Sequence, residues 1–159
     1  MKYRIDPTVL SRVTADRRRE LEEALLDLET EDDGEPPTLV VGVLPDGGLA
    51  YAVESAEGGV TAVPLPYPRV ARVFREYRDV IQRLARSDLG SFGMRDFETL
   101  DYAKKLVHDE AGALLRKTLR TAVNIDLAQA RRLFTLSFLL SSDLPEEVIR
   151  THRRHGAPT

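Results

Sequence analysis

The spacing of apolar residues along the chain predicts four long helices. Within residues 15–28, 68–85, 95–120 and from 127 onward, apolar positions recur every three or four residues, the period of an amphipathic helix. The second segment carries the widest apolar stripe, made of Val70, Val73, Phe74, Tyr77, Val80, Ile81 and Leu84. The stripe of the third consists of Leu100, Ala103, Val107, Ala111 and Leu114. Residues 133–140 are apolar nearly all round, so we expect the last long helix to be central and buried.

Short segments between the first two helices have the composition of strands. Residues 39–44, 49–53 and 60–63 are rich in Val, Leu and Tyr, and the turns 45–48 (PDGG) and 55–59 (SAEGG) separate them. Such close strands must pair antiparallel, because parallel pairs need a longer crossover. Residues 3–5 could add a short strand, and residues 122–126 another strand or an extended link. The pattern predicts an α+β fold, in which a small antiparallel sheet of three to five short strands is covered by four to five helices.

We expect residues 1–142 to form a single α+β domain and residues 143–159 to form a C-terminal helical extension with a basic tail. Residues 29–37 (ETEDDGEPP) predict an acidic loop. This loop could bind a divalent cation, but it lacks the alternating spacing of an EF-hand, and a solvated connector is the simpler interpretation. The tail histidines His152 and His155 could share a metal ion, yet no nearby carboxylate or cysteine completes a ligand set, so we predict no metal site.

The composition of the chain indicates a soluble globular domain and argues against several other classes of protein. At 159 residues, with 42% hydrophobic and 31% charged residues, the chain has the size and balance of one soluble globular domain. A net charge of −3 argues against nucleic acid as the partner. The absence of cysteine excludes thiolate chemistry and fits a reducing compartment. The first residues lack the apolar core of a signal peptide, and no apolar stretch approaches the roughly 20 residues that span a bilayer. We therefore expect a cytoplasmic protein that does not bind membranes.

The triplet His108-Asp109-Glu110 is the first candidate for a site, because imidazole and carboxylate groups together can bind metal or transfer protons. On a helix, residues two apart are rotated by about 200°, so His108 and Glu110 flank the apolar stripe and cannot form a dyad with each other. A structural role for both residues is therefore favoured over a catalytic one. The remaining functional hypothesis pairs one of them with Arg131 or Arg132 of the next helix, around a small anion.

A second candidate is the polar side of the helix predicted at residues 68–85 and just beyond it, which we call the arginine face. Its members are Arg69, Arg72, Arg75, Arg83 and Arg86. A planar guanidinium group binds two oxygens of a carboxylate or phosphate, so the arginine face could recognise an anionic partner. Glu76 and Asp79 lie among the arginines and no aromatic residues interleave with them, which favours the alternative of a solvated face.

Several stretches of the chain resemble an uncharacterised family of bacterial proteins, number two-six-two of the UPF series. They are LPYPRV (residues 65–70), LDYAKKLVHDEAGALL (100–115) and AVNIDLAQARRLFTL (122–136). The resemblance covers residues 15–140 and is most specific in the last stretch. Asp109 stands where the family pattern has Asn, and Ala111 separates Glu110 from Gly112, whereas the family glycine directly follows the glutamate. The family has no assigned activity, so the resemblance implies a bacterial cytoplasmic protein and no particular substrate.

These patterns favour a non-enzymatic interaction or regulatory protein over an enzyme. The chain carries no cofactor fingerprint, so we expect no cofactor. The expected partner is a protein or an anionic molecule, bound through the arginine face or an exposed apolar helix side, and a homodimer is one form of such an interaction. The alternative is a small enzyme or ligand-binding protein whose pocket lies between the helices predicted at 95–120 and from 127 onward. The lining of that pocket would be His108, Glu110, Arg131 and Arg132.

Overall fold

The computed structural model describes residues 1–29, 34–88 and 94–141 of the chain. The elements, in chain order, are β1 (Lys2–Ile5), α1 (Pro7–Leu10), α2 (Ala15–Glu29), β2 (Thr38–Val43), β3 (Leu49–Glu54), β4 (Val60–Val63), α3 (Tyr67–Asp88), α4 (Met94–Leu119) and α5 (Leu127–Ser141). The predicted α+β class and the four long helices are confirmed. The predicted C-terminal extension at 143–159, with His152 and His155, and residues 30–33 of the acidic loop lie outside the described residues. No helix in the described ranges is both long and apolar enough to cross a bilayer.

The described strands form one sheet in the order β1-β2-β3-β4. Strands β2, β3 and β4 pair antiparallel as predicted, with Val41 opposite Tyr51 and Tyr51 opposite Val63. Strand β1, in contrast, pairs parallel with β2, so the sheet is mixed and the prediction of a purely antiparallel sheet is wrong in this detail. The reason is the connection from β1 to β2 through α2, which provides the crossover that a parallel pair requires.

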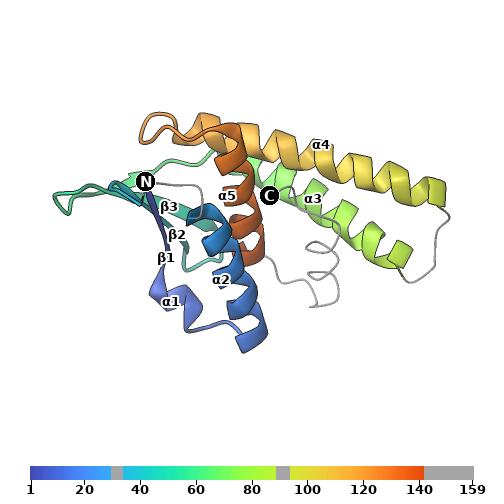
Figure 1. Ribbon diagram of the computed structural model, residues 1–159, viewed down its shortest axis with the longest axis horizontal. Coiled ribbons are helices and arrows are strands. Elements are labelled where there is room, and N and C mark those ends of the chain that lie inside the picture. Colours follow the sequence, from blue (N-terminus) through green and yellow to red (C-terminus); the bar gives the residue numbers. More distant parts are fainter. Residues whose placement is uncertain (30–33, 89–93, 142–159) are drawn as a thin grey trace.

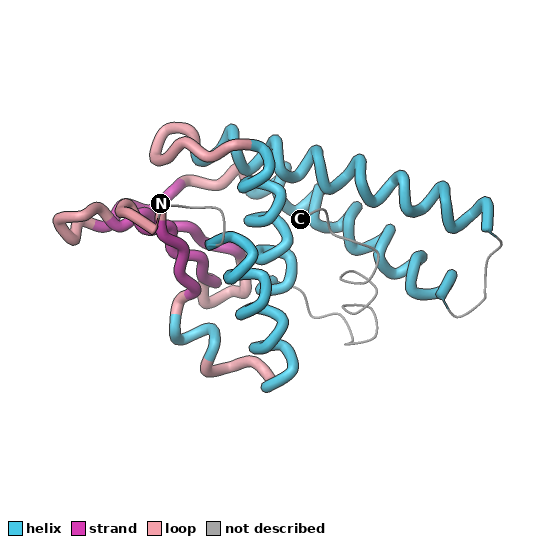
Figure 2. The backbone as a smooth tube through the Cα atoms, viewed as in Figure 1, coloured by secondary structure: helices cyan, strands magenta, loops and turns pink. Residues whose placement is uncertain are grey.

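Helices α2 and α5 cover one face of the sheet, whereas α3 and α4 form a long pair that extends beyond it (Figure 1 and Figure 2). Alternate strand residues are buried against the covering helices, because successive side chains of a strand point to opposite faces. These buried residues include Tyr3, Ile5, Leu39, Val41, Leu49, Tyr51 and Val53. The core lies between the sheet and α5 and continues between α5 and the α3–α4 pair.

Helix α5 is the central element, as its nearly uniform apolar composition predicted. Asp126 caps its first turn, because the Oδ1 atom accepts a hydrogen bond from the backbone N–H of Gln129 at 2.7 Å. Deeper in the core, the hydroxyl oxygens of Tyr51 and Ser137 lie 2.5 Å apart and join β3 to α5. Residues 122–126 form the extended link, not the alternative strand.

The short helix α1 is absent from the sequence prediction, although the chain contains a signal for it. The Oδ1 atom of Asp6 accepts a hydrogen bond from the backbone N–H of Thr8 at 3.0 Å, which caps the helix. Pro7 follows in the first turn, where the missing N–H has no partner to lose. The pair Asp6-Pro7 is therefore a start signal for a helix, but the segment is too short for the spacing of its apolar residues to support the prediction.

The buried side of α4 differs from the predicted stripe. Leu100, Ala103 and Val107 are only partly buried, whereas Lys104 and His108 are 1% and 0% exposed. The helix packs against α3 and against α5, so its most buried line lies where these two contacts meet. A hydropathy pattern ranks lysine and histidine as polar and therefore misses these two residues. The predicted stripe still faces the core, because Ala111 is 1% exposed and the other members are partly buried against it.

Gly112 lies where α4 crosses α5, and we expect a large side chain there to separate the two helices. A Cβ atom on Gly112 would lie 2.7 Å from Arg131 Cγ and 3.3 Å from the Arg131 backbone nitrogen. Gly112→Leu should therefore lower the free energy of unfolding by about 2 kcal/mol, the usual cost of overpacking, even though leucine favours helix. Urea denaturation followed by circular dichroism measures this change.

The matched control is Ala113→Leu, because Ala113 is the next residue of the same helix and is exposed. This control should change the free energy of unfolding by no more than about 0.5 kcal/mol. Equal stability of the Gly112→Leu and Ala113→Leu variants would contradict the close approach of α4 to α5.

Candidate functional site

His108 lies in the core where α3, α4 and α5 meet. The centroid of its ring is 5.6 Å from that of Tyr77 and 5.1 Å from that of Phe134, both in edge-to-face geometry. Its Nε2 atom lies 3.0 Å from Thr135 Oγ1. The Thr135 hydroxyl donates to the backbone carbonyl of Arg131 at 3.3 Å, so the neutral His108 ring donates from Nε2 to the Thr135 oxygen.

Burial has the largest influence on the pKa of the His108 imidazole. Burial first, and then the positive charges of Arg131 and Lys104, lower the pKa of His108 from 6.5 to about 3. Burial also lowers the pKa of the Lys104 ammonium group to about 8. The imidazole is therefore neutral at physiological pH and packed among aromatic rings, an environment that favours the structural role. On the described part of the chain, hollows lie over β1, over β4 and beside α3. His108 lines none of these hollows.

Glu110 points away from the core and contacts a different helix. It is exposed, and its Oε1 atom accepts a hydrogen bond from Nη2 of Arg72 on α3 at 3.0 Å. Asp109 pairs with Arg131 of α5, whose Nε atom lies 3.1 Å from Asp109 Oδ1. Arg132 is partly buried on α5. The structure thus brings Glu110 to Arg72 of α3, and it is Asp109, the middle residue of the candidate triplet, that lies beside Arg131.

All members of the arginine face are exposed, and ion pairs divide them into two groups. Arg72 lies beside the carboxylates of Glu76 and Glu110, and Arg83 Nη2 lies 3.2 Å from Asp79 Oδ2. The other members pair with no carboxylate in the part of the chain that the structure describes, and we call them the unpaired arginines. They are Arg69, Arg75 and Arg86.

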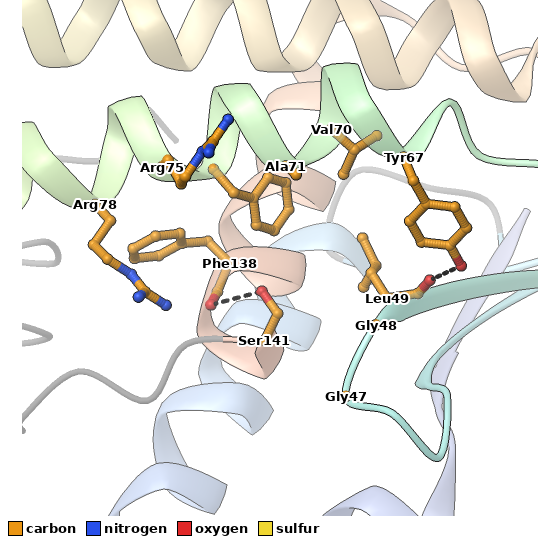
Figure 3. A pocket seen from close by; sticks show the side chains of 11 residues that line it. Gly47, Gly48, Leu49, Tyr67, Val70, Ala71, Arg75, Arg78, Phe138 and Ser141 are labelled. Carbon is orange, nitrogen blue, oxygen red and sulfur yellow. Dashed lines mark hydrogen bonds between the residues drawn. The ribbon is translucent and has the colours of Figure 1, made fainter.

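A hollow that the sequence did not indicate lies beside α3. Its volume is about 240 Å³, and α3, the turn between β2 and β3 and the end of α5 form its walls (Figure 3). Phe74 and Phe138 contribute apolar surface, and Arg75 and Arg78 contribute positive charge. Arg78 is not among the predicted site residues, because it borders the apolar stripe of α3. No local pattern could reveal the hollow, since its walls come from segments far apart in the chain.

A metal-binding site would need several His, Cys, Asp or Glu side chains close together, and the described residues contain no such group. Nowhere in residues 1–29, 34–88 and 94–141 do three His, Cys, Asp or Glu side chains gather as a metal site would require. What the described surface offers is guanidinium groups beside apolar side chains. Guanidinium groups bind carboxylate and phosphate oxygens through paired N–H donors.

Comparison with known proteins places the chain among proteins without an assigned activity. The model of a family described as "Uncharacterised protein family (UPF0262)" matches residues 1–142, a slightly longer range than the resemblance in the sequence. A UPF0262 protein of Novosphingobium aromaticivorans is 33% identical over 100 residues, which are 60% of this chain and 60% of that relative. A UPF0262 protein of Rhizobium etli is 27% identical over 150 residues, which are 86% of this chain and 90% of that relative. No solved structure matches the chain.

Proposed function

Because this chain belongs to the uncharacterised protein family UPF0262, whose description carries no activity, we propose a function from its described surface. We propose that it is a non-enzymatic interaction protein that recognises an acidic protein surface through the arginine face. The observation that carries this proposal is the set of unpaired arginines, which stand exposed along one long helix.

An unpaired guanidinium group contributes more to binding than a paired one. Arg72 and Arg83 already lie beside carboxylates, so a new partner would only replace one exposed ion pair by another. An exposed ion pair contributes about 0.2–1 kcal/mol, and such an exchange gains almost nothing. Arg69, Arg75 and Arg86 have no such pair to break in the described chain, so their full attraction for a carboxylate is available. Several such charges on one side also speed the encounter with an acidic partner.

The carboxylates on and beside α3 favour a protein partner over a nucleic acid. Glu76, Asp79 and Glu110 interrupt the positive surface between the arginines. A nucleic acid presents a continuous row of phosphates, which these carboxylates would repel. An acidic protein surface can place neutral or basic groups opposite these carboxylates and acidic groups opposite the arginines. Its charges can therefore match the alternating charges on and beside α3.

The test removes two unpaired arginines and follows the capture of a partner. Affinity-tagged chain is incubated with lysate of the native bacterium, and retained proteins are identified after nuclease treatment. For the double variant Arg69→Gln with Arg86→Gln, we expect the amount of a specifically retained protein to fall about tenfold, since two contacts of about 0.7 kcal/mol each are lost. Raising the salt concentration should weaken retention by the unaltered chain, because salt screens exposed charges.

The matched control is the double variant Arg18→Gln with Arg19→Gln, which removes the same charge from α2. Both residues are exposed and pair with carboxylates of their own helix. This control should retain the partner fully. If both double variants lose the partner equally, or neither does, the arginine face is not the recognition surface. A second, untagged copy of the chain is included in the experiment, because a homodimer is one form of the expected interaction.

A further inference from the structure

Strand β4 forms one edge of the sheet, and its outer side is exposed. Among the described residues it pairs with β3 alone, because the order of the strands ends at β4. Val60, Thr61 and Ala62 are all exposed, and the exposed fraction of Val60 is 64%. The outer side of β4 is therefore accessible to a strand from outside the described chain.

The main chain of β4 presents hydrogen-bonding groups on this outer side. The backbone N–H of Ser55 donates to the carbonyl of Gly59 at 2.8 Å, which makes these two residues a hydrogen-bonded pair. Bonded and non-bonded pairs alternate along an antiparallel ladder, so Thr61 is bonded to β3, whereas Val60 and Ala62 are not. The N–H and C=O groups of Val60 and Ala62 therefore point away from β3 and bond to no other group of the described chain.

The two edges of the sheet differ in charge. An exposed edge can pair with a strand of another chain, and charged side chains, above all lysine, oppose such pairing. The opposite edge, β1, carries Lys2 and Arg4. Strand β4 (VTAV) and its neighbours Gly59 and Pro64 carry no charge. Two copies of β4 can therefore approach each other without repulsion between like charges in the strands.

A second copy of β4 matches the outward groups in one antiparallel register. With a two-fold axis beside Thr61, Val60 lies opposite Ala62 of the second copy, and Ala62 lies opposite its Val60. Each of these two pairs exchanges two hydrogen bonds, so all the outward groups of both residues are paired. Thr61 then faces Thr61 of the second copy at a Cβ distance of about 5 Å, within reach of a stabilising contact.

We propose that the protein forms a two-fold symmetric dimer in which the β4 strands of two copies pair antiparallel and join the two sheets. The pairing also buries apolar surface of Val60, which adds to the hydrogen bonds. A hollow of about 560 Å³ beside Thr61 leaves space for side chains of the second copy. The inference goes beyond the acidic partner proposed above, because the arginine face belongs to α3 and supplies no group to this pairing.

Sedimentation velocity of the full chain over a range of concentrations tests the dimer. The unaltered chain should dimerise with a Kd below about 100 µM, a weak value that suits a small interface. Thr61→Glu and Thr61→Lys should each raise this Kd at least about tenfold, because each variant places two like charges directly opposite one another. An equimolar mixture of the two variants should dimerise again, because opposite charges then face each other.

The matched control is Thr61→Gln, which has nearly the size of Thr61→Glu and no charge, so it should keep the dimer. Thr61 is exposed, so the fold should tolerate all three changes, and circular dichroism checks this. Ala62→Pro removes a donor that points outward and leaves the β3–β4 ladder intact, since proline is tolerated where an edge N–H faces solvent. This variant should also raise the Kd at least about tenfold, because the lost N–H belongs to the pairing and the proline ring obstructs it.

Several results would overturn the inference. They are a monomer at all concentrations up to about 1 mM, equal Kd values for Thr61→Glu and Thr61→Gln, an unchanged Kd for Ala62→Pro, or no dimer in the mixture of Thr61→Glu with Thr61→Lys. A dimer that persists in Thr61→Glu but dissociates in the double variant Arg69→Gln with Arg86→Gln would assign self-association to the arginine face instead. A monomeric chain that still captures an acidic partner would refute the dimer and leave the function proposed above intact.

Discussion

Replacing Phe134 by alanine is expected to lower the free energy of unfolding by about 4 kcal/mol. Phe134 is 0% exposed and lies on α5, where its ring meets three other rings edge to face. The centroid distances are 5.1 Å to Phe74, 5.0 Å to Tyr77 and 5.1 Å to His108. Because these neighbours belong to α3 and α4, which α5 holds in place, the space left by the missing ring cannot collapse easily. The cost therefore includes both the lost burial and the remaining cavity.

Urea denaturation of the Phe134→Ala variant, followed by circular dichroism, measures this loss. Tyr102→Ala is the matched control, since Tyr102 is an aromatic residue of α4 that is 64% exposed. The control should cost no more than about 1 kcal/mol. A loss for Phe134→Ala as small as that of the control would mean that the aromatic cluster is not the centre of the helical core.

Acidification should destabilise the protein through His108. The folded chain binds the His108 proton only near pH 3, because burial lowers this pKa, whereas the unfolded chain binds it near pH 6.5. Between these values the unfolded state holds more protons, so the free energy of unfolding falls as the pH falls. The slope is about 1.4 kcal/mol per pH unit, which amounts to about 2.7 kcal/mol at pH 4.5. Above pH 6.5 the contribution is fully present and constant.

The measurement is urea denaturation at several pH values between 7 and 4.5. His108→Leu is the control, because it removes the imidazole and keeps an apolar side chain of moderate size in the core. Carboxylates titrate in both proteins, so the difference between the two slopes isolates His108. Parallel slopes would show that the imidazole is not buried in the neutral form. Lys104, whose pKa is lowered to about 8 by burial, stays protonated throughout this range and does not add to the difference.

The part of the fold that depends on neighbours in the chain was predictable. The apolar stripe from Val70 to Leu84 marks α3 because side chains three and four apart share one side of a helix. The turn at residues 45–48 marks the β2–β3 hairpin, because two strands joined by a tight turn have to pair antiparallel. Aspartate is a preferred residue at the start of a helix, and the Asp126 side chain caps α5 by accepting a hydrogen bond from the backbone N–H of Gln129.

The candidate sites were predictable only in part, because exposure follows from a local pattern and pairing does not. The exposure of the arginine face follows from its position opposite the stripe of α3. That Glu110 approaches Arg72 depends on how α4 packs against α3, and this contact joins residues 38 positions apart. The same packing turns His108 into the core, where the predicted stripe had placed Leu100 and Val107. The hollow beside α3 combines three separate segments, so no pattern within one of them could announce it.

By itself, the sequence determined the long helices, the hairpin strands, the central position of α5 and the exposure of the arginines. These features follow from periodicity and turn chemistry, which act over a few residues. Only the tertiary structure decided that β1 runs parallel to β2, that Lys104 and His108 are buried, and which members of the arginine face pair with a carboxylate of the described residues. The physical reason is that these properties depend on distances between segments far apart in the chain, and such distances are set when the elements pack on one another.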